Sequence, residues 1–212
     1  IFPDLAAIQR QFHHLIRIVP SDGMLIVNGE EHALNEVLAM GCWTPIERFA
    51  IDVDAEWQAR LIKADGSEFA LIYKGQELGI VQWSMLGRHN VMNALAAFAA
   101  CAAVGVDVSK IISNLKQFVS VKRRLEHIGT VQNITIYDDF AHHPTAIQTT
   151  LAGLRAKVGN ARIIAAMEPR SNSMRLGAHA EQIAPSLDDA DVVVFLHRPE
   201  LAWDAKAVVS AL

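Results

Sequence analysis

Cysteine is scarce in this chain of 212 residues, and the scarcity argues against two classes of protein. Only Cys42 and Cys101 are present, and they lie too far apart in sequence to form the closely spaced pairs of a zinc module. Two cysteines also fall short of the disulfide framework that stabilises small secreted domains. The core must therefore come from packing, and 51% of the residues are hydrophobic, which is enough for one or two domains.

Long apolar runs and excess positive charge are also missing. The longest apolar run extends from Ala94 to Val106, whereas a membrane-spanning helix needs about 20 such residues, so we expect a buried helix here. The net charge of −4 offers no general attraction to nucleic acids or anionic membranes. We expect neither of these partners.

The beginning of the chain lacks both a Met and the features of a secretory leader. Ile1 leads directly into a helix pattern. We therefore expect a piece of a longer, cytoplasmic protein. The sequence leaves the oligomeric state open, with a monomer favoured.

The first half contains two kinds of pattern. Apolar residues at helical spacing, or in a long alanine-rich run, predict helices over residues 5–19, 33–40, 86–104 and 107–118, with Asp107 and Ser109 as candidate caps of the last. Short apolar and alternating runs predict strands at residues 24–27, 42–43, 48–51, 56–63 and 68–81. Turn residues at 65–66 and 74–75 make the later strands antiparallel.

The second half alternates strand and helix patterns. Strands are expected at residues 125–128, 131–137, 162–167 and 192–196, and helices at 146–155, 177–187 and 203–212. Such alternation is typical of parallel βαβ units, so we expect an α/β fold. A polar, basic link follows residue 118 and separates the two kinds of pattern, which predicts one domain over residues 1–118 and a second over residues 119–212.

Polar residues concentrate between a predicted strand and the helix that follows it. Asp138, Asp139, His142 and His143 precede Pro144 at this crossing. In open α/β sheets, ligands bind at the carboxyl ends of the strands, and helix N-termini offer free N–H groups to anions. The aspartates can hold ribose hydroxyls or a metal, while the histidines can orient an acid or contact a substrate carboxylate.

Less specific explanations of this cluster remain open. An Asp-Asp pair also forms ordinary turns, and adjacent histidines often mark a partly buried strand end. A metal-dependent hydrolase is another reading, but neighbouring side chains diverge, which disfavours one compact metal site. A nucleotide- or peptide-binding module without catalysis is a further alternative.

A second cluster opens the alanine-rich helix. Asn90 and Asn93 are three residues apart and share a helix face, following His89. An Asn side chain can pair with the edge of adenine through two hydrogen bonds. The alternative is that Asn90 only caps the helix.

Arginines form a third set of candidates. Arg123 and Arg124 lie in the polar link between the two halves, where a guanidinium can hold a phosphate or belong to a solvated basic patch. Arg170 and Arg175 follow the strand at residues 162–167 and can bind carboxylates.

In this order, the clusters resemble the Mur ligase family, whose members add amino acids or peptides to a peptidoglycan precursor using ATP. The stretch from Leu86 to Ala94 is similar to a helix entry in the family's central ATPase domain. Arg124 matches an arginine at the start of the C-terminal domain, and Asp139 matches an aspartate that helps hold the nucleotide. The resemblance implies the later part of the central domain followed by a Rossmann-like domain with a mostly parallel sheet.

The reaction implied by the resemblance joins UDP-N-acetylmuramate to the murein tripeptide L-alanyl-γ-D-glutamyl-meso-diaminopimelate through an acyl phosphate, with ATP and Mg²⁺. The stretches at residues 8–15 and 168–174 favour the tripeptide over free L-alanine. The implied site comprises catalytic Arg124, His142 and His143, nucleotide-binding His89, Asn90, Asn93, Arg124, Asp138 and Asp139, and substrate-binding Arg170, Ser171, Asn172 and Arg175.

The sequence departs from the family pattern in one respect. No Gly-x-x-x-x-Gly-Lys-Ser/Thr phosphate loop occurs in the 212 residues. The resemblance therefore places that loop, the UDP-binding domain and the metal ligands before Ile1, and the end of the C-terminal domain after Leu212. We assign no metal ligand within this chain, and we expect the chain alone to be inactive.

Overall fold

The computed structural model describes residues 2–169, 171–177, 179–196, 201, 203 and 205–210. Within these limits the chain divides into two compact units. The first comprises residues 1–63, 68–83 and 89–118, and the second comprises residues 64–67, 84–88 and 119–212. Two short segments of the first half thus belong to the second unit.

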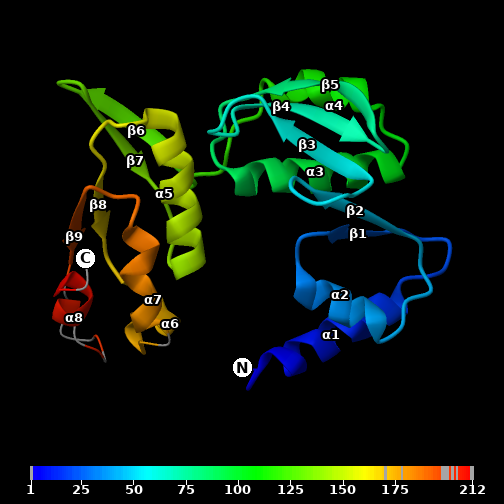
Figure 1. The fold of residues 1–212 in the computed structure, drawn as a ribbon, viewed down its shortest axis with the longest axis horizontal. Coiled ribbons are helices and arrows are strands. Elements are labelled where there is room, and N and C mark those ends of the chain that lie inside the picture. Colours follow the sequence, from blue (N-terminus) through cyan, green and yellow to red (C-terminus); the bar gives the residue numbers. More distant parts are fainter. Residues whose placement is uncertain are drawn as a thin grey trace. The chain divides into compact units, whose positions relative to one another are not determined.

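The first unit is built on a five-stranded sheet whose order is β1-β2-β3-β4-β5 (Figure 1). Its first three strands are parallel, and β3, β4 and β5 are antiparallel. The elements are α1 (Leu5–Ile18), β1 (Leu25–Asn28), α2 (His32–Ala39), β2 (Ile46–Ala50), β3 (Trp57–Leu61), β4 (Glu68–Tyr73), β5 (Gln76–Gln82), α3 (Arg88–Ala103) and α4 (Val108–Leu115).

Packing of α3 against the sheet creates the core of this unit. Leu95 and Phe98 are fully buried, and they belong to one cluster with Trp57, Phe69 and Leu71 of the strands. The alanine-rich run is therefore a buried helix, as predicted. None of the helices in the described part of the chain is long and apolar enough to cross a membrane.

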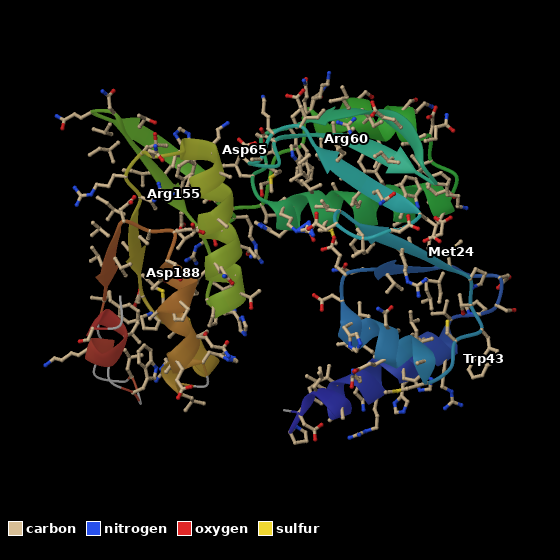
Figure 2. All side chains as sticks on the ribbon, in the orientation of Figure 1. Met24, Trp43, Arg60, Asp65, Arg155 and Asp188 are labelled. Carbon is tan, nitrogen blue, oxygen red and sulfur yellow. The ribbon has the colours of Figure 1, made fainter. Side chains whose placement is uncertain are left out.

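The boundaries of these elements confirm most of the predicted ones. Asp107 caps α4, because its carboxylate accepts the N–H of Ser109 at 2.9 Å. The strand expected at residues 42–43 is wrong. Cys42 and Trp43 lie in the connection between α2 and β2, where Trp43 is 73% exposed (Figure 2).

The second unit contains two separate pairs of strands. The elements are β6 (Glu126–Val131), β7 (Ile134–Asp138), α5 (Pro144–Val158), β8 (Ile164–Met167), α6 (Asn172–Arg175), α7 (Ala180–Ile183), a 3₁₀ turn η1 (Pro185–Leu187), β9 (Val192–Phe195) and α8 (Ala205–Ser210). A cluster that includes Ile147 and Leu151 of α5 with Ile183 and Leu187 forms the core.

The parallel arrangement predicted for this half holds for β8 and β9 but not for β6 and β7. Strands β6 and β7 form an antiparallel hairpin, and they are joined by Gln132 and Asn133, whose φ values are 49° and 65°. Two residues with positive φ are typical of a tight hairpin turn. Parallel strands need a long crossover, so a two-residue link excludes that arrangement.

The helix predicted over residues 177–187 is also wrong as a continuous element. It is divided into α7 and η1, and α6 lies before it. Pro185 lacks an N–H and its ring clashes with the preceding helical turn, which ends α7. Of the helix predicted over residues 203–212, α8 covers residues 205–210, and the last two residues lie outside the described part.

Gly153 of α5 gives a test of packing inside the second unit. A Cβ atom there would lie 2.8 Å from Cα of Gly87, which is backbone and cannot rotate away. We expect Gly153→Ala to lower the free energy of unfolding by about 1–2 kcal/mol, because overpacking costs more than the helix gains from alanine. Denaturant titration measures this difference.

Gly129 is the matched control, because a Cβ there meets nothing within 4 Å. Gly129→Ala should leave stability nearly unchanged. Equal stability of the two variants would contradict the close contact at Gly153.

Candidate functional site

The polar stretch lies where the sequence predicts it, between the end of β7 and the beginning of α5. His143 is the N-cap residue of α5, Pro144 is the first helical residue, and the N–H of Thr145 donates to Nδ1 of His143 at 3.3 Å. Proline fits this first position because its fixed φ suits the helix and no N–H is needed there. The crossing therefore ends in a proline-started helix, with the histidines at its N-terminus.

Asp139 binds backbone on both sides of the hairpin. Its Oδ2 accepts the N–H of Leu125 at 2.7 Å, and its Oδ1 accepts the N–H of Ala141 at 2.7 Å. Charge-assisted hydrogen bonds of this length are among the stronger ones in proteins. The carboxylate thus connects the segment that enters β6 to the segment that leaves β7.

Asp138 points to a different partner. Its carboxylate pairs with Nε of Arg123 at 3.3 Å, and the Arg123 guanidinium lies over the ring of Phe140 at 5.1 Å. The N–H of Phe140 also donates to the carbonyl of Arg123 at 2.8 Å. The two aspartates therefore diverge, as expected for neighbouring residues.

A metal-dependent hydrolase does not fit these side chains. Among the described residues, no three His, Cys, Asp or Glu side chains form a group that could hold a metal ion. The four polar residues of the crossing instead have separate partners in backbone and in other side chains.

Arg124 differs from its neighbour Arg123. It is exposed, and within the described part of the chain its guanidinium has neither a hydrogen bond nor an ion pair. The flanking residues Arg123 and Leu125 have φ values of 62° and 46°, which side-chain-bearing residues rarely adopt. The backbone around Arg124 is thus held in an unusual conformation while its side chain stays available.

The histidines of the crossing contact two other groups. Nδ1 of His142 donates to the carbonyl of Phe140 at 2.9 Å, since a carbonyl can only accept. The ring of His143 lies 4.5 Å from the ring of His179, the N-cap residue of α7. This ring contact brings the segment after β7 next to the segment after β8.

Burial lowers the pKa of His143 below its ordinary value of 6.5, and the nearby His179 and His142 lower it further. The unfolded chain therefore binds this proton more tightly than the folded protein. We expect the free energy of unfolding to rise with pH from the lowered pKa up to about 6.5. Above that value the His143 ring is neutral in both states, so it no longer makes stability depend on pH.

A substitution isolates this contribution. His143→Asn keeps an N-cap acceptor but removes the titrating ring, so it should flatten the rise in stability with pH below about 6.5. His127→Asn, in the exposed hairpin, is the control and should keep the rise. Urea titrations at several pH values measure both, and an unchanged slope in His143→Asn would contradict the assignment.

The predicted substrate-binding residues follow β8, as expected from the sequence. Oγ of Ser171 accepts the N–H of Met174 at 3.3 Å, so Ser171 is a cap of α6 in this structure. Asn172 and Arg175 are the two ends of α6, and Arg175 is exposed. Arg170 lies outside the described residues.

The predicted adenine-binding residues belong to the first unit. His89, Asn90 and Asn93 lie in the first turns of α3, and Asn93 is exposed. Because α3 begins at Arg88, Asn90 is inside the helix and is not its N-cap residue. The capping explanation for Asn90 is therefore wrong.

Several residues that stabilise the second unit escape sequence reasoning. Buried Asp65 accepts the N–H of Ser67 at 2.9 Å and pairs with Lys157 of α5 at 3.4 Å. Burial raises the pKa of Asp65, but hydrogen bonds from Ser67 and the charge of Lys157 lower it overall. Arg155 of α5 pairs with Asp191 at 2.7 Å (Figure 2 labels Asp65 and Arg155). No local pattern marks these partners, because they are distant in sequence; the same applies to His179.

Comparison with known families identifies matches on both halves. The family model described as the Mur ligase middle domain matches residues 1–101, and that of the Mur ligase, glutamate ligase domain, matches residues 123–212. Together these matches cover most of the chain.

Three relatives illustrate the similarity. The chain is 46% identical over 211 residues to the UDP-N-acetylmuramate–L-alanyl-γ-D-glutamyl-meso-2,6-diaminoheptandioate ligase of Haemophilus influenzae. That alignment covers 99% of this chain and 46% of the relative. The chain is 33% identical over 195 residues to the UDP-N-acetylmuramate–L-alanine ligase of Desulfitobacterium hafniense. That alignment covers 91% of this chain and 42% of the relative. The crystal structure of a murein peptide ligase from Psychrobacter arcticus has a TM-score of 0.67 at 45% identity, covering 99% of this chain and 44% of that one. The chain thus spans about half the length of the curated relatives it matches.

Proposed function

Because the chain belongs to the Mur ligase family, we propose that it is part of an ATP-dependent ligase that joins a peptide to UDP-N-acetylmuramate. The domain boundary proposed at residues 118 and 119 is supported by the two family matches, which end and begin on either side of it. The reaction would take place in the cytoplasm, where ATP is available.

The peptide we propose is the tripeptide L-alanyl-γ-D-glutamyl-meso-diaminopimelate. One observation carries this choice: identity is 46% to a ligase named for that tripeptide and 33% to one named for L-alanine. Both comparisons cover nearly the whole chain, so the gap does not come from alignment length.

The proposed reaction has two steps. ATP transfers its terminal phosphoryl group to the lactyl carboxylate of UDP-N-acetylmuramate, which forms an acyl phosphate and ADP. The amino group of the tripeptide then attacks the carbonyl carbon, the C–N bond forms, and phosphate leaves. The transferred group carries negative charge throughout, so catalysis needs positioned positive charge.

The candidate site residues suit these steps in different ways. We assign Arg124 to the transferring phosphoryl group, because its guanidinium is exposed and has no hydrogen bond or ion pair among the described residues. We assign two groups of residues to UDP-N-acetylmuramate and the tripeptide: His142 and His143, and, after β8, Arg170, Ser171, Asn172 and Arg175. Asn90 and Asn93 are assigned to adenine, with His89 beside them.

Mg²⁺ is expected in such a phosphoryl transfer, where one or two carboxylates together with the substrate phosphates commonly hold it. No three metal-ligating side chains come together in this part of the chain. We propose that the metal is held by residues outside this sequence, and we assign no step of this chain to it.

The test is phosphate release from ATP by the complete protein, with each substrate omitted in turn. We expect release that requires both UDP-N-acetylmuramate and the tripeptide, and little release when free L-alanine replaces the tripeptide. Release that needs neither UDP-N-acetylmuramate nor the tripeptide would indicate an ATPase, and release supported equally by L-alanine would indicate a UDP-N-acetylmuramate–L-alanine ligase.

A further inference from the structure

The segment that presents Arg124 is held in place by a small set of contacts within the second unit. Arg123 and Leu125 both have positive φ, so Arg124 lies between two residues in the left-handed region. Conformations of this kind cost free energy and persist only where the surroundings impose them. The contacts that impose this one identify the residues that position Arg124.

Three hydrogen bonds hold the segment, and two come from the stretch after β7. The N–H of Leu125 donates to Oδ2 of Asp139 at 2.7 Å, and the carbonyl of Arg123 accepts the N–H of Phe140 at 2.8 Å. The third is local, from the N–H of Arg123 to the carboxylate of Glu126 at 2.8 Å. Of these three bonds, the one from Leu125 is accepted by a side chain distant in sequence, that of Asp139.

Asp139 is also fixed by its second oxygen. Oδ1 accepts the N–H of Ala141 at 2.7 Å, so each oxygen of the carboxylate already has a backbone donor. The carboxylate is half-buried and needs no ligand to satisfy it. Its geometry is that of a group that holds two pieces of backbone at a set distance.

We propose that Asp139 is a positioning residue that acts through the Leu125 backbone to aim Arg124. This inference rests on the proposed function, in which Arg124 contacts the transferring phosphoryl group. It differs from the nucleotide contact that the family resemblance implies for Asp139, because the effect of Asp139 on turnover passes through Arg124.

A double-mutant cycle in the complete protein tests this pathway. Arg124→Ala and Asp139→Ala should each lower kcat by ~10²-fold, as loss or misplacement of an electrostatic group does in other active sites. If Asp139 acts only through Arg124, the double variant should stay within ~3-fold of Arg124→Ala alone. Independent roles would instead multiply to ~10⁴-fold, which would overturn the proposal.

Hydrogen exchange provides a readout that does not depend on ligase activity. In Asp139→Ala, the amides of Leu125 and Ala141 should exchange at least ~10-fold faster, while the amide of Val193 in β9 should be unchanged. Asp139→Asn keeps one acceptor oxygen and should protect only one of the two amides.

Asp138→Ala is the matched control for exchange, because its carboxylate pairs with the Arg123 side chain and not with the Leu125 N–H. Unchanged exchange at Leu125 in Asp139→Ala, or equal acceleration in Asp138→Ala, would overturn the positioning role. A complete wild-type protein without ligase activity would instead overturn the proposed function, and the exchange result would still decide what Asp139 holds.

Discussion

Arg124→Ala in the complete protein is expected to lower kcat by ~10²-fold, with a smaller effect on binding of the tripeptide. Arg124 is exposed and its guanidinium has no hydrogen bond or ion pair in the described part of the chain, so truncation removes no such contact there. What is lost is a positive charge placed near the phosphoryl group as it transfers. Such electrostatic stabilisers contribute roughly 2–4 kcal/mol to the transition state.

Arg60 offers a control for surface arginines. Arg60, labelled in Figure 2, lies on β3 and pairs with Glu77 of β5 at 2.8 Å, and both side chains are exposed. Arg60→Ala should leave kcat and KM unchanged, because exposed ion pairs contribute little. Steady-state kinetics on both variants decide the matter: if Arg124→Ala keeps the wild-type kcat, the arginine belongs to a solvated basic patch.

Arg170→Ala is expected to raise the KM for the tripeptide by ~10-fold or more, with the KM for ATP nearly unchanged. Arg170 follows Pro169 after β8, and the tripeptide carries several carboxylates where L-alanine carries one. A guanidinium bound to a carboxylate contributes roughly 1.5–3 kcal/mol, and its planar fork is lost in the lysine variant. Arg170→Lys should therefore restore the KM only in part.

Arg162 is the matched arginine for this test, since it is exposed and precedes β8 where Arg170 follows it. Arg162→Ala should leave both KM values unchanged. An equal rise of the KM for ATP in Arg170→Ala, or no rise for the tripeptide, would remove Arg170 from the substrate site.

Elements with strong local signals could be predicted from the sequence. The alanine-rich α3 and the capped α4 were predictable because apolar spacing and the Asp107 cap are local features. The crossing from β7 into α5 was predictable because a β-branched run ends at a polar cluster before Pro144. In all three cases the signal lies within a few residues of the element that it predicts.

Features that depend on distant partners could not be predicted. Asp138 and Asp139 are identical in type and adjacent, yet one pairs with a side chain and the other with two backbone amides. The contact between His143 and His179 depends on how α5 and α7 pack. The break between α7 and η1 followed from Pro185, a signal present in the sequence but outweighed by apolar spacing.

The most direct test of the account identifies the product made by the complete protein. UDP-N-acetylmuramate, ATP and equal concentrations of the tripeptide and L-alanine are incubated with it, and the nucleotide-linked products are separated by mass spectrometry. The account predicts that the tripeptide adduct accumulates, with one phosphate released for each adduct. Accumulation of the alanine adduct, or release of phosphate without either adduct, would contradict it.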